Sequence, residues 1–397
     1  MKIKNFLLLI FILPTIAFAQ EEKKDSLVYQ INDVVNLKAT SVKDQYRSGT
    51  CWAFSGLSFI ESELLRMGKG EHDLAEMWLV KKDYHERAVD YVRWQGAKNF
   101  GGGAESNNVF DRIAQAGIMP EENFPGLNYG EKKHVHGELD LLLDAYVNAV
   151  IKNKNRKLTD AWIHGFDGIL DAYLGVDIEK FTYNEKEYTP ISFRDEMNIV
   201  ATDYIEIGSF THHPFYTEFI IEVPDNWSLG TVHNVPLNEM LETAYYALDH
   251  GYTILWGSDV SEKGFSHKTG VAIVPEDDIK EMLGSEQDKW EKLSEKERNK
   301  QLYKFEEIVQ EKVITQEIRQ EAFDKYQTTD DHGMHITGYA TDQNGTKYFK
   351  VKNSWNTENP YDGYFYASES WFLYKTLSIM IHKDAIPKGI KKKLNIK

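Results

Sequence analysis

The spacing of apolar side chains predicts helices in the first half of the chain. After Glu138, apolar residues recur at intervals of three and four positions, a period typical of an amphipathic helix. The members of this repeat are Leu139, Leu142, Leu143, Tyr146, Val147 and Val150. Similar patterns predict three earlier helices, over residues 52–68, 74–94 and 106–116.

Shorter apolar stretches in the second half predict strands instead. They cover residues 201–207, 217–223 and 253–256. Two further stretches, 334–340 and 347–351, flank Asn344-Gly345, a dipeptide typical of a β-hairpin turn. Because helices come first, the middle is mixed and antiparallel strands come last, we predict an α+β fold rather than a wound parallel sheet.

The first 19 residues have the pattern of a secretory signal peptide. Lys2 and Lys4 precede an apolar run over residues 6–16, and Ala17-Phe18-Ala19 supplies the small residues of a cleavage site. The run is too short to span a bilayer, and no later segment has about 20 uncharged apolar residues. We therefore expect segment 1–19 to be removed and the protein to be exported, to a periplasm or the exterior, without a membrane span.

Composition limits the partners that this protein can have. The formal net charge is −16, and loss of the two lysines of the signal peptide makes it more negative. A surface this acidic disfavours nucleic acids and anionic membranes as partners. Hydrophobic residues make up 42% of the chain, which is ample for one large domain with insertions or for two closely joined parts.

Cys51 is the single cysteine of a chain that we expect to be exported, so it has no partner for an internal disulfide. It lies at the start of the predicted helix 52–68, where unpaired N–H groups and the helix dipole favour an anion. A thiolate at such a position has a lowered pKa and is nucleophilic near neutral pH. We therefore interpret Cys51 as a nucleophile rather than as a small buried hydrophobic residue.

The predicted hairpin carries the groups that a cysteine nucleophile requires. His332 and His335 lie on its first strand, where alternating side chains point to opposite faces, so only one of them can face Cys51. Asn353 follows the second strand and can orient the imidazole of that histidine, while Trp355 can cover the pair from water.

Four short motifs resemble the papain-like cysteine peptidases. The first is Gln45, which stands six residues before the start of the second, Cys51-Trp52-Ala53-Phe54-Ser55. The third is Asp331-His332 followed by Gly338-Tyr339, and the fourth is Lys352-Asn353-Ser354-Trp355. The order Gln, Cys, His, Asn is that of the family. The resemblance implies that His332 is the catalytic histidine, that Gln45 and the Cys51 backbone N–H form the oxyanion hole, and that Gly102 and Gly103 pair with extended substrate.

Within that family the chain resembles the bleomycin hydrolase and aminopeptidase C branch. The resemblance rests on Ser48-Gly49-Thr50-Cys51-Trp52, on the missing propeptide, and on long helical insertions at about 126–200 and 276–326 of a peptidase domain over 20–397. It implies a two-part fold, with a helical part and an antiparallel β-barrel-like part. It further implies a homohexamer, peptide substrates, no cofactor, and aminopeptidase action through a C-terminal arm in the cleft.

Some features depart from that pattern and leave alternatives open. The basic tail 388–397 does not match the family's arm, and Asn356 stands where the family has glycine. An endopeptidase with an open cleft, or a catalytically silent peptide-binding protein, would also fit. His212-His213 could bind a metal ion, but no carboxylate or cysteine stands near it at ligand spacing, so we predict no metal site.

Overall fold

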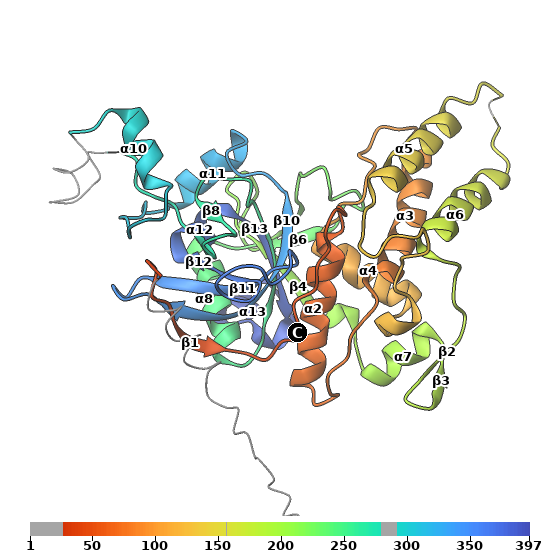
Figure 1. The fold of residues 1–397 in the computed structure, drawn as a ribbon, viewed down its shortest axis with the longest axis horizontal. Coiled ribbons are helices and arrows are strands. Elements are labelled where there is room, and N and C mark those ends of the chain that lie inside the picture. Colours follow the sequence, from red (N-terminus) through yellow and green to blue (C-terminus); the bar gives the residue numbers. More distant parts are fainter. Residues whose placement is uncertain (1–26, 156, 279–291) are drawn as a thin grey trace, which may run out of the picture.

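The computed structural model describes residues 27–155, 157–278 and 292–397. The predicted signal peptide, 1–19, lies outside these ranges, as does part of the charged segment 276–326. In the described residues the chain has two parts that meet along one buried helix (Figure 1). No helix in the described ranges is both long and apolar enough to cross a membrane.

The first part is built from helices and lies on the right in Figure 1. Its helices are α2 (Cys51–Arg66), α3 (Glu76–Arg93), α4 (Ser106–Ala116), α5 (Gly137–Ile151), α6 (Ala161–Leu174) and α7 (Pro190–Met197). A small antiparallel hairpin, β2 (Phe181–Tyr183) with β3 (Lys186–Tyr188), packs against α7. The four helices predicted from apolar spacing correspond to α2 to α5, and their ends agree to within about two residues.

The second part is an 11-stranded, mainly antiparallel sheet with the order β5-β6-β4-β13-β7-β10-β11-β12-β9-β8, and β1 also pairs with β10. The strands are β1 (Asn32–Asn36), β4 (Tyr204–Gly208), β5 (Glu218–Ile220), β6 (Thr231–Asn234), β7 (Ile254–Ser258), β8 (Phe265–Ser266), β9 (Val271–Ala272), β10 (His332–Thr341), β11 (Lys347–Lys352), β12 (Tyr364–Ser368) and β13 (Thr376–His382). The predicted hairpin is β10–β11. The prediction of an α+β fold is confirmed.

Within the described ranges, five further helices lie with the sheet. They are α8 (Leu237–Asp249), α10 (Glu295–Leu302), α11 (Gln316–Asp324), α12 (Glu369–Lys375) and α13 (Lys388–Lys393). Neighbouring residues of β7 show how the sheet separates two cores. Leu255 packs with the helical part, whereas Ile254 and Trp256 pack with the cluster that includes α8. This alternation follows from the two-residue period of a strand.

Helix α2 joins the two parts of the molecule. Thirteen of its 16 residues are buried, as expected for a helix with neighbours on every side. Gly56 permits the close approach of α4, because a Cβ at this position would lie 2.4 Å from a methyl carbon of Val109. The helix therefore begins, at Cys51, in the groove where the helical part and the sheet meet.

The C-terminal tail is folded against the sheet part. Residues 388–393 form α13, and Ile390 and Leu394 are buried in the core that contains α8. Lys393 lies 2.6 Å from Glu239 of α8. The tail is therefore not solvated along its whole length, because Ile390 and Leu394, four residues apart, lie on one face of this short helical segment and that face is buried.

Candidate active site

A glycine on β10 brings the start of that strand against the start of α2. A Cβ at Gly333 would lie 2.8 Å from Ser55 Oγ and 3.3 Å from Trp52 Cα, so any larger residue would push the strand away. Because His332 precedes this glycine and Cys51 precedes Trp52, the close contact places the thiol and the imidazole in one cleft.

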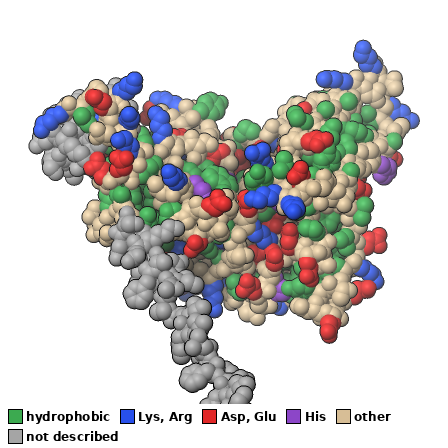
Figure 2. All heavy atoms as spheres, viewed as in Figure 1, with side chains coloured by type: hydrophobic (Ala, Val, Ile, Leu, Met, Phe, Trp, Pro, Cys, Tyr) green, Lys and Arg blue, Asp and Glu red, His purple; other side chains and the backbone are tan. Residues whose placement is uncertain are grey.

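The cleft has a volume of about 310 Å³ and runs between the two parts of the molecule. In the space-filling view, the upper outline of the molecule dips between these parts (Figure 2). The predicted site residues that line the cleft are Gln45, Cys51, Gly103, His332 and Trp355. They come from the loop before α2, from α2 itself, from the loop before α4 and from both sides of the hairpin.

Asn353 and Trp355 hold the ring of His332 from two directions. The His332 Nε2 atom lies 2.8 Å from Asn353 Oδ1, which also accepts a hydrogen bond of 2.8 Å from the Ser354 backbone N–H. Since Oδ1 can only accept, Nε2 carries the proton and Nδ1 is left free. The Trp355 ring stacks on the imidazole with a centroid separation of 4.6 Å.

Gln45 is fixed at the opposite edge of the cleft. Its Nε2 donates to the Ser48 carbonyl at 2.9 Å, and its Oε1 accepts from Ser354 Oγ at 2.6 Å. One amide hydrogen is therefore used by the loop, and the other is available to a ligand.

The three glycines before α4 have different roles in the structure. Gly103 lines the cleft, whereas the Gly102 carbonyl accepts a hydrogen bond of 2.9 Å from the Trp52 indole N–H. Arg87 holds this loop by donating to the Gly101 carbonyl at 2.9 Å and to the Gly103 carbonyl. A Cβ at Gly103 would overlap the carboxylate of Asp225, so a larger residue there would displace that side chain from the cleft wall.

Comparisons with known proteins agree with this arrangement. Residues 30–169 match the model of the papain family of cysteine proteases, and residues 284–397 match that of the peptidase C1-like family. The solved structure of PepW from Lactobacillus rhamnosis superposes with a TM-score of 0.68, at 18% sequence identity, over 95% of this chain and 86% of that one. The chain belongs to the papain-like cysteine peptidases.

Two curated relatives lie in the aminopeptidase branch of this family. Aminopeptidase C of Streptococcus thermophilus is 21% identical over 94% of this chain and 86% of its own length. Aminopeptidase G of Lactobacillus delbrueckii subsp. lactis is 23% identical, but the match spans 53% of this chain and less than half, 43%, of that protein. The predicted resemblance to the bleomycin hydrolase and aminopeptidase C branch of the papain-like peptidases is therefore confirmed.

The electrostatics of this papain-like cleft differ from the expectation drawn from helix position alone. Burial, together with the nearby Asp330 and Asp225, raises the pKa of the Cys51 thiol to about 12. Burial lowers the pKa of His332 to about 4. The helix N-terminus therefore does not by itself ionise the thiol. The two charges can form only together, when the thiol proton moves to the imidazole.

Four acidic residues line the cleft, and all except Asp331, which belongs to the histidine motif, were missed by the sequence reasoning. Glu105, Asp225, Asp330 and Asp331 line the same cleft as Cys51. A signal existed for two of them, because Glu105 follows Gly103 by two residues and Asp330 precedes His332 by two. Asp225 comes from a distant loop, and only the fold brings it to this site.

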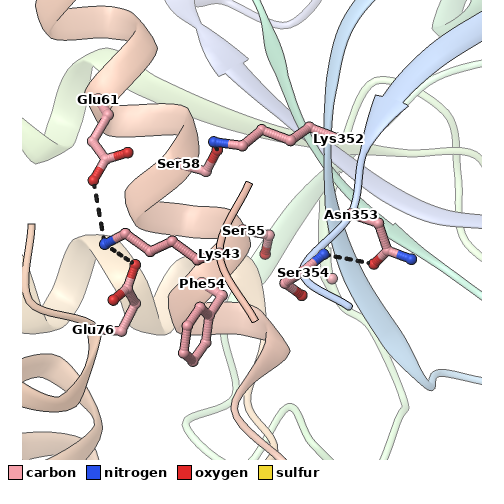
Figure 3. A pocket seen from close by; sticks show the side chains of 10 residues that line it. Lys43, Phe54, Ser55, Ser58, Glu61, Glu76, Lys352, Asn353 and Ser354 are labelled. Carbon is pink, nitrogen blue, oxygen red and sulfur yellow. Dashed lines mark hydrogen bonds and ion pairs between the residues drawn. The ribbon is translucent and has the colours of Figure 1, made fainter. Parts of the chain in front are cut away.

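The second histidine of β10 belongs to a buried polar network behind the cleft. His335 Nδ1 lies 2.9 Å from Ser58 Oγ, which in turn accepts from Lys352 Nζ at 2.7 Å. Nearby, Lys43 lies between Glu61 and Glu76, at 3.7 and 2.7 Å (Figure 3). His335 thus faces the side of α2, and the separation of the two histidines expected from strand alternation is observed.

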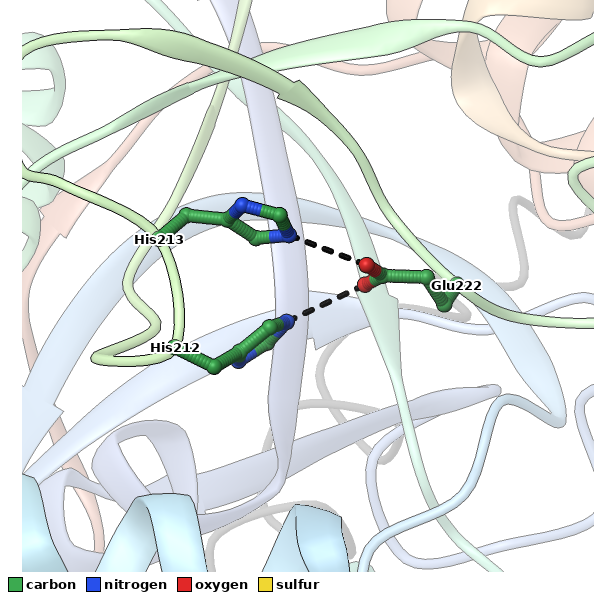
Figure 4. Close-up of side chains that lie close together, drawn as sticks. All are labelled: His212, His213 and Glu222. Atoms are coloured by element: carbon green, nitrogen blue, oxygen red, sulfur yellow. Dashed lines mark hydrogen bonds and ion pairs between the residues drawn. The ribbon is translucent and has the colours of Figure 1, made fainter.

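The pair His212-His213 has a partner that its sequence spacing did not reveal. The Nε2 atoms of both rings point at Glu222, at 3.1 and 2.9 Å (Figure 4). The amide of Gln320 donates to His212 Nδ1 at 2.9 Å, while its oxygen accepts from the Thr211 N–H at 2.6 Å. With Nδ1 accepting from Gln320, Nε2 of His212 donates to Glu222, so the cluster is held by hydrogen bonds. The expectation that no carboxylate stands near the pair is wrong, because one ligand atom from each of His212, His213 and Glu222 lies within 4.8 Å of the others, close enough to ligate a metal ion.

Proposed function

We propose that this protein is a thiol peptidase in which Cys51 is the nucleophile and His332 the general base and acid. The observation that carries this function is the cleft in which Cys51 meets an imidazole whose Nε2 is bound to Asn353 and whose Nδ1 is free. A Cys-His pair oriented by a third polar group is the arrangement needed for acyl transfer.

The reaction follows from the positions of these groups. The Cys51 proton moves to His332 Nδ1, and the sulfur attacks the substrate carbonyl carbon. The backbone N–H of Cys51, which has no helical acceptor at this first position, and the free amide hydrogen of Gln45 stabilise the oxyanion. His332 then gives its proton to the leaving amine, and water, deprotonated by the same imidazole, hydrolyses the thioester. Asn353 keeps the ring in the required tautomer.

The substrates that we propose are short peptides, from which the enzyme removes the N-terminal residue. Support comes from the two relatives named aminopeptidases, one of which matches along most of both chains. The resemblance to the family predicted that a C-terminal arm, lying in the cleft, would be the cause of aminopeptidase action. Residues 388–397, however, pack against α8, and none of them lines the cleft.

This position of the tail favours a second candidate, an endopeptidase whose cleft is open at both ends. A catalytically silent peptide-binding protein is the third reading of the same cleft. Export through residues 1–19 and assembly into a hexamer stay predictions. Mass spectrometry of the exported protein's N-terminus and light scattering of the purified protein would test them.

One pair of substrates separates these functions. An aminoacyl coumarin amide with a free α-amine is compared with its N-acetylated twin under reducing conditions, with Cys51→Ala as the blank. Cleavage of the free-amine substrate alone supports an aminopeptidase, whereas cleavage of both supports an endopeptidase. Full activity in Cys51→Ala would overturn the thiol mechanism. If neither substrate is cleaved and Cys51 reacts with iodoacetamide no faster than glutathione does, the result would support the catalytically silent peptide-binding protein.

A further inference from the structure

The wall of the cleft is acidic next to the nucleophile. Glu105, Asp225, Asp330 and Asp331 line it together with Cys51 and His332. Among the described residues that form this wall, none is lysine or arginine. A cleft with one sign of charge and low-dielectric walls attracts ligands of the opposite sign.

Two of the four carboxylates are partnered by the protein itself. Asp331 accepts hydrogen bonds of 2.8 and 3.0 Å from the backbone N–H groups of Val260 and Ser261. Asp225 accepts a bond of 2.8 Å from the Asn99 amide and lies 3.5 Å from the Arg87 guanidinium. The fold thus explains these two acids without any ligand.

Among the described residues, no backbone N–H group, lysine or arginine is paired with the carboxyl group of Glu105 or of Asp330. Glu105 precedes α4 in the helical part and Asp330 precedes β10 in the sheet part, and the two carboxyl groups lie close enough for each to shift the pKa of the other. Glu105 is 5% exposed, and its Oε1 has no hydrogen-bond partner among the described residues. Burial and the neighbouring acids raise the pKa of Asp330 to about 6 and that of Glu105 well above its ordinary value. Buried acids without a cation are costly, so their position in a reactive cleft calls for a positive ligand.

We propose that Glu105 and Asp330, supported by Asp225, form a subsite that binds the α-ammonium group of the substrate. The inference rests on the proposed peptidase function. In a substrate cleaved after its first residue, the α-nitrogen lies only about 2.5 Å from the carbonyl carbon that Cys51 attacks. A group that recognises it must therefore lie in the same cleft as the thiol. These two acids meet that condition, whereas the described tail residues 388–397 do not.

The same charges connect binding to reactivity. Asp330 and Asp225 are among the causes that raise the pKa of Cys51, because they disfavour a thiolate nearby. A bound ammonium group neutralises them, so the substrate that fits the subsite also eases transfer of the thiol proton to His332. Removal of Asp330 should accordingly weaken recognition of the amine and, in the free enzyme, make the thiol more reactive. A merely structural carboxylate would not produce these opposite effects.

The test compares Glu105→Gln and Asp330→Asn, both nearly isosteric, with wild type and with Glu321→Gln, a matched loss of one carboxylate from the exposed face of α11. The substrates are leucine coumarin amide and its N-acetylated twin. We expect wild type and Glu321→Gln to prefer the free amine by at least tenfold in kcat/KM. In Glu105→Gln and Asp330→Asn, kcat/KM should fall at least tenfold for the free-amine substrate, and it should stay equal or rise for the acetylated twin. Equal loss on both substrates, or no loss, would overturn the subsite.

A second pair of substrates separates the two possible sources of the cation. N-acetyl-Arg-Leu and N-acetyl-Leu-Leu coumarin amides differ only in a basic side chain one residue further from the cleaved bond. If the cleft variants lose a preference for arginine but keep the preference for a free α-amine, the α-ammonium assignment is overturned.

A measurement without turnover keeps this inference separate from the proposed function. Leucinamide should change the rate of Cys51 alkylation by iodoacetamide at pH 7, whereas N-acetyl-leucinamide should not, and Asp330→Asn should abolish the difference. Without leucinamide, Asp330→Asn should be alkylated faster than wild type. If these effects are seen and no amide is cleaved, the peptidase function fails and the subsite stands. If free-amine substrates are cleaved and leucinamide has no effect, the subsite fails and the peptidase function stands.

Discussion

The two histidines of β10 lie three residues apart on opposite faces of one strand, in two different kinds of polar region. His332 lies in the cleft with the half-buried Cys51 and Asp330 and with the buried Glu105, whose Oε1 has no hydrogen-bond partner among the described residues. His335 lies in the network behind it, where Ser58 bridges the ring to the ammonium group of Lys352. Both regions fill the contact between α2 and the sheet.

The difference shows how one interface can be reactive on one side and structural on the other. In the network, hydroxyl groups and opposite charges stabilise the buried ions: Glu61 accepts from Thr40 and from the Leu74 N–H, and it forms an ion pair with Lys43. In the cleft, like charges lie together and the thiol and imidazole stay neutral. Unpaired polar groups cost stability, and they are retained where a ligand or a reaction will pair them.

Loss of the cleft histidine should have the largest effect on activity. His332→Ala removes the base that takes the thiol proton, so kcat/KM should fall by at least about 10³-fold. The melting temperature should also fall moderately, because the buried ring is lost from its stack on Trp355 and its hydrogen bond to Asn353. Steady-state kinetics and a thermal melt check both parts. A His332→Ala enzyme within tenfold of wild type would show that another group acts as the base.

Loss of the network lysine should affect stability instead. Lys352→Met leaves the hydroxyl groups of Ser58 and Thr40 without their donor, at a cost of about 1–3 kcal/mol at pH 7. Burial lowers the pKa of Lys352 to about 8, so the unfolded chain binds this proton more tightly than the folded one. The free energy of unfolding of the wild type should therefore rise as pH increases from about 8 to 10.5, whereas that of Lys352→Met should not show this rise. Urea unfolding of both proteins at pH 7.5 and 9.5 measures the difference.

His335→Asn should give a smaller loss, because Asn keeps an acceptor near the position of Nδ1. We expect a cost of about 1–2 kcal/mol at pH 8, from lost packing against Phe59. Burial and Lys352 hold the pKa of His335 well below 6.5. Wild type must therefore lose stability as pH falls below about 6.5, and the gap to His335→Asn should narrow at pH 5. A gap that widens on acidification would contradict a neutral His335.

Asp330→Asn should show the smallest effect on stability, and this effect should be a gain rather than a loss. Because the folded-state pKa of Asp330 is raised to about 6, mainly by burial, folding loses stability as pH rises from about 3.8 to 6. The amide avoids this loss, so the variant should be more stable than wild type above pH 6, by on the order of 1 kcal/mol. Below pH 4 the gain should vanish. Melting curves at pH 7.5 and 4 decide this, and a destabilised variant at pH 7.5 would place Asp330 among the structural acids.

The sequence contained most of the information on the fold class and on the reacting groups. Apolar periodicity placed α2 to α5 and the β10–β11 hairpin, because burial of one face imposes a period on each element. It did less well where elements are short. Residues 201–203 form a 3-10 turn before β4, and β5 covers only Glu218–Ile220 of the predicted strand 217–223.

What the sequence alone determined about this protein is the set of chemical groups and their order along the chain: Gln45, Cys51, His332 and Asn353. Only the tertiary structure decided their charge, since the ionisation of Cys51 depends on burial and on Asp225 and Asp330, which reach the thiol from distant segments. It also decided that the tail 388–397 packs on α8 and that Glu222 meets two histidines. Local patterns encode which face of an element is buried, whereas electrostatic energy depends on distances that only the folded chain sets.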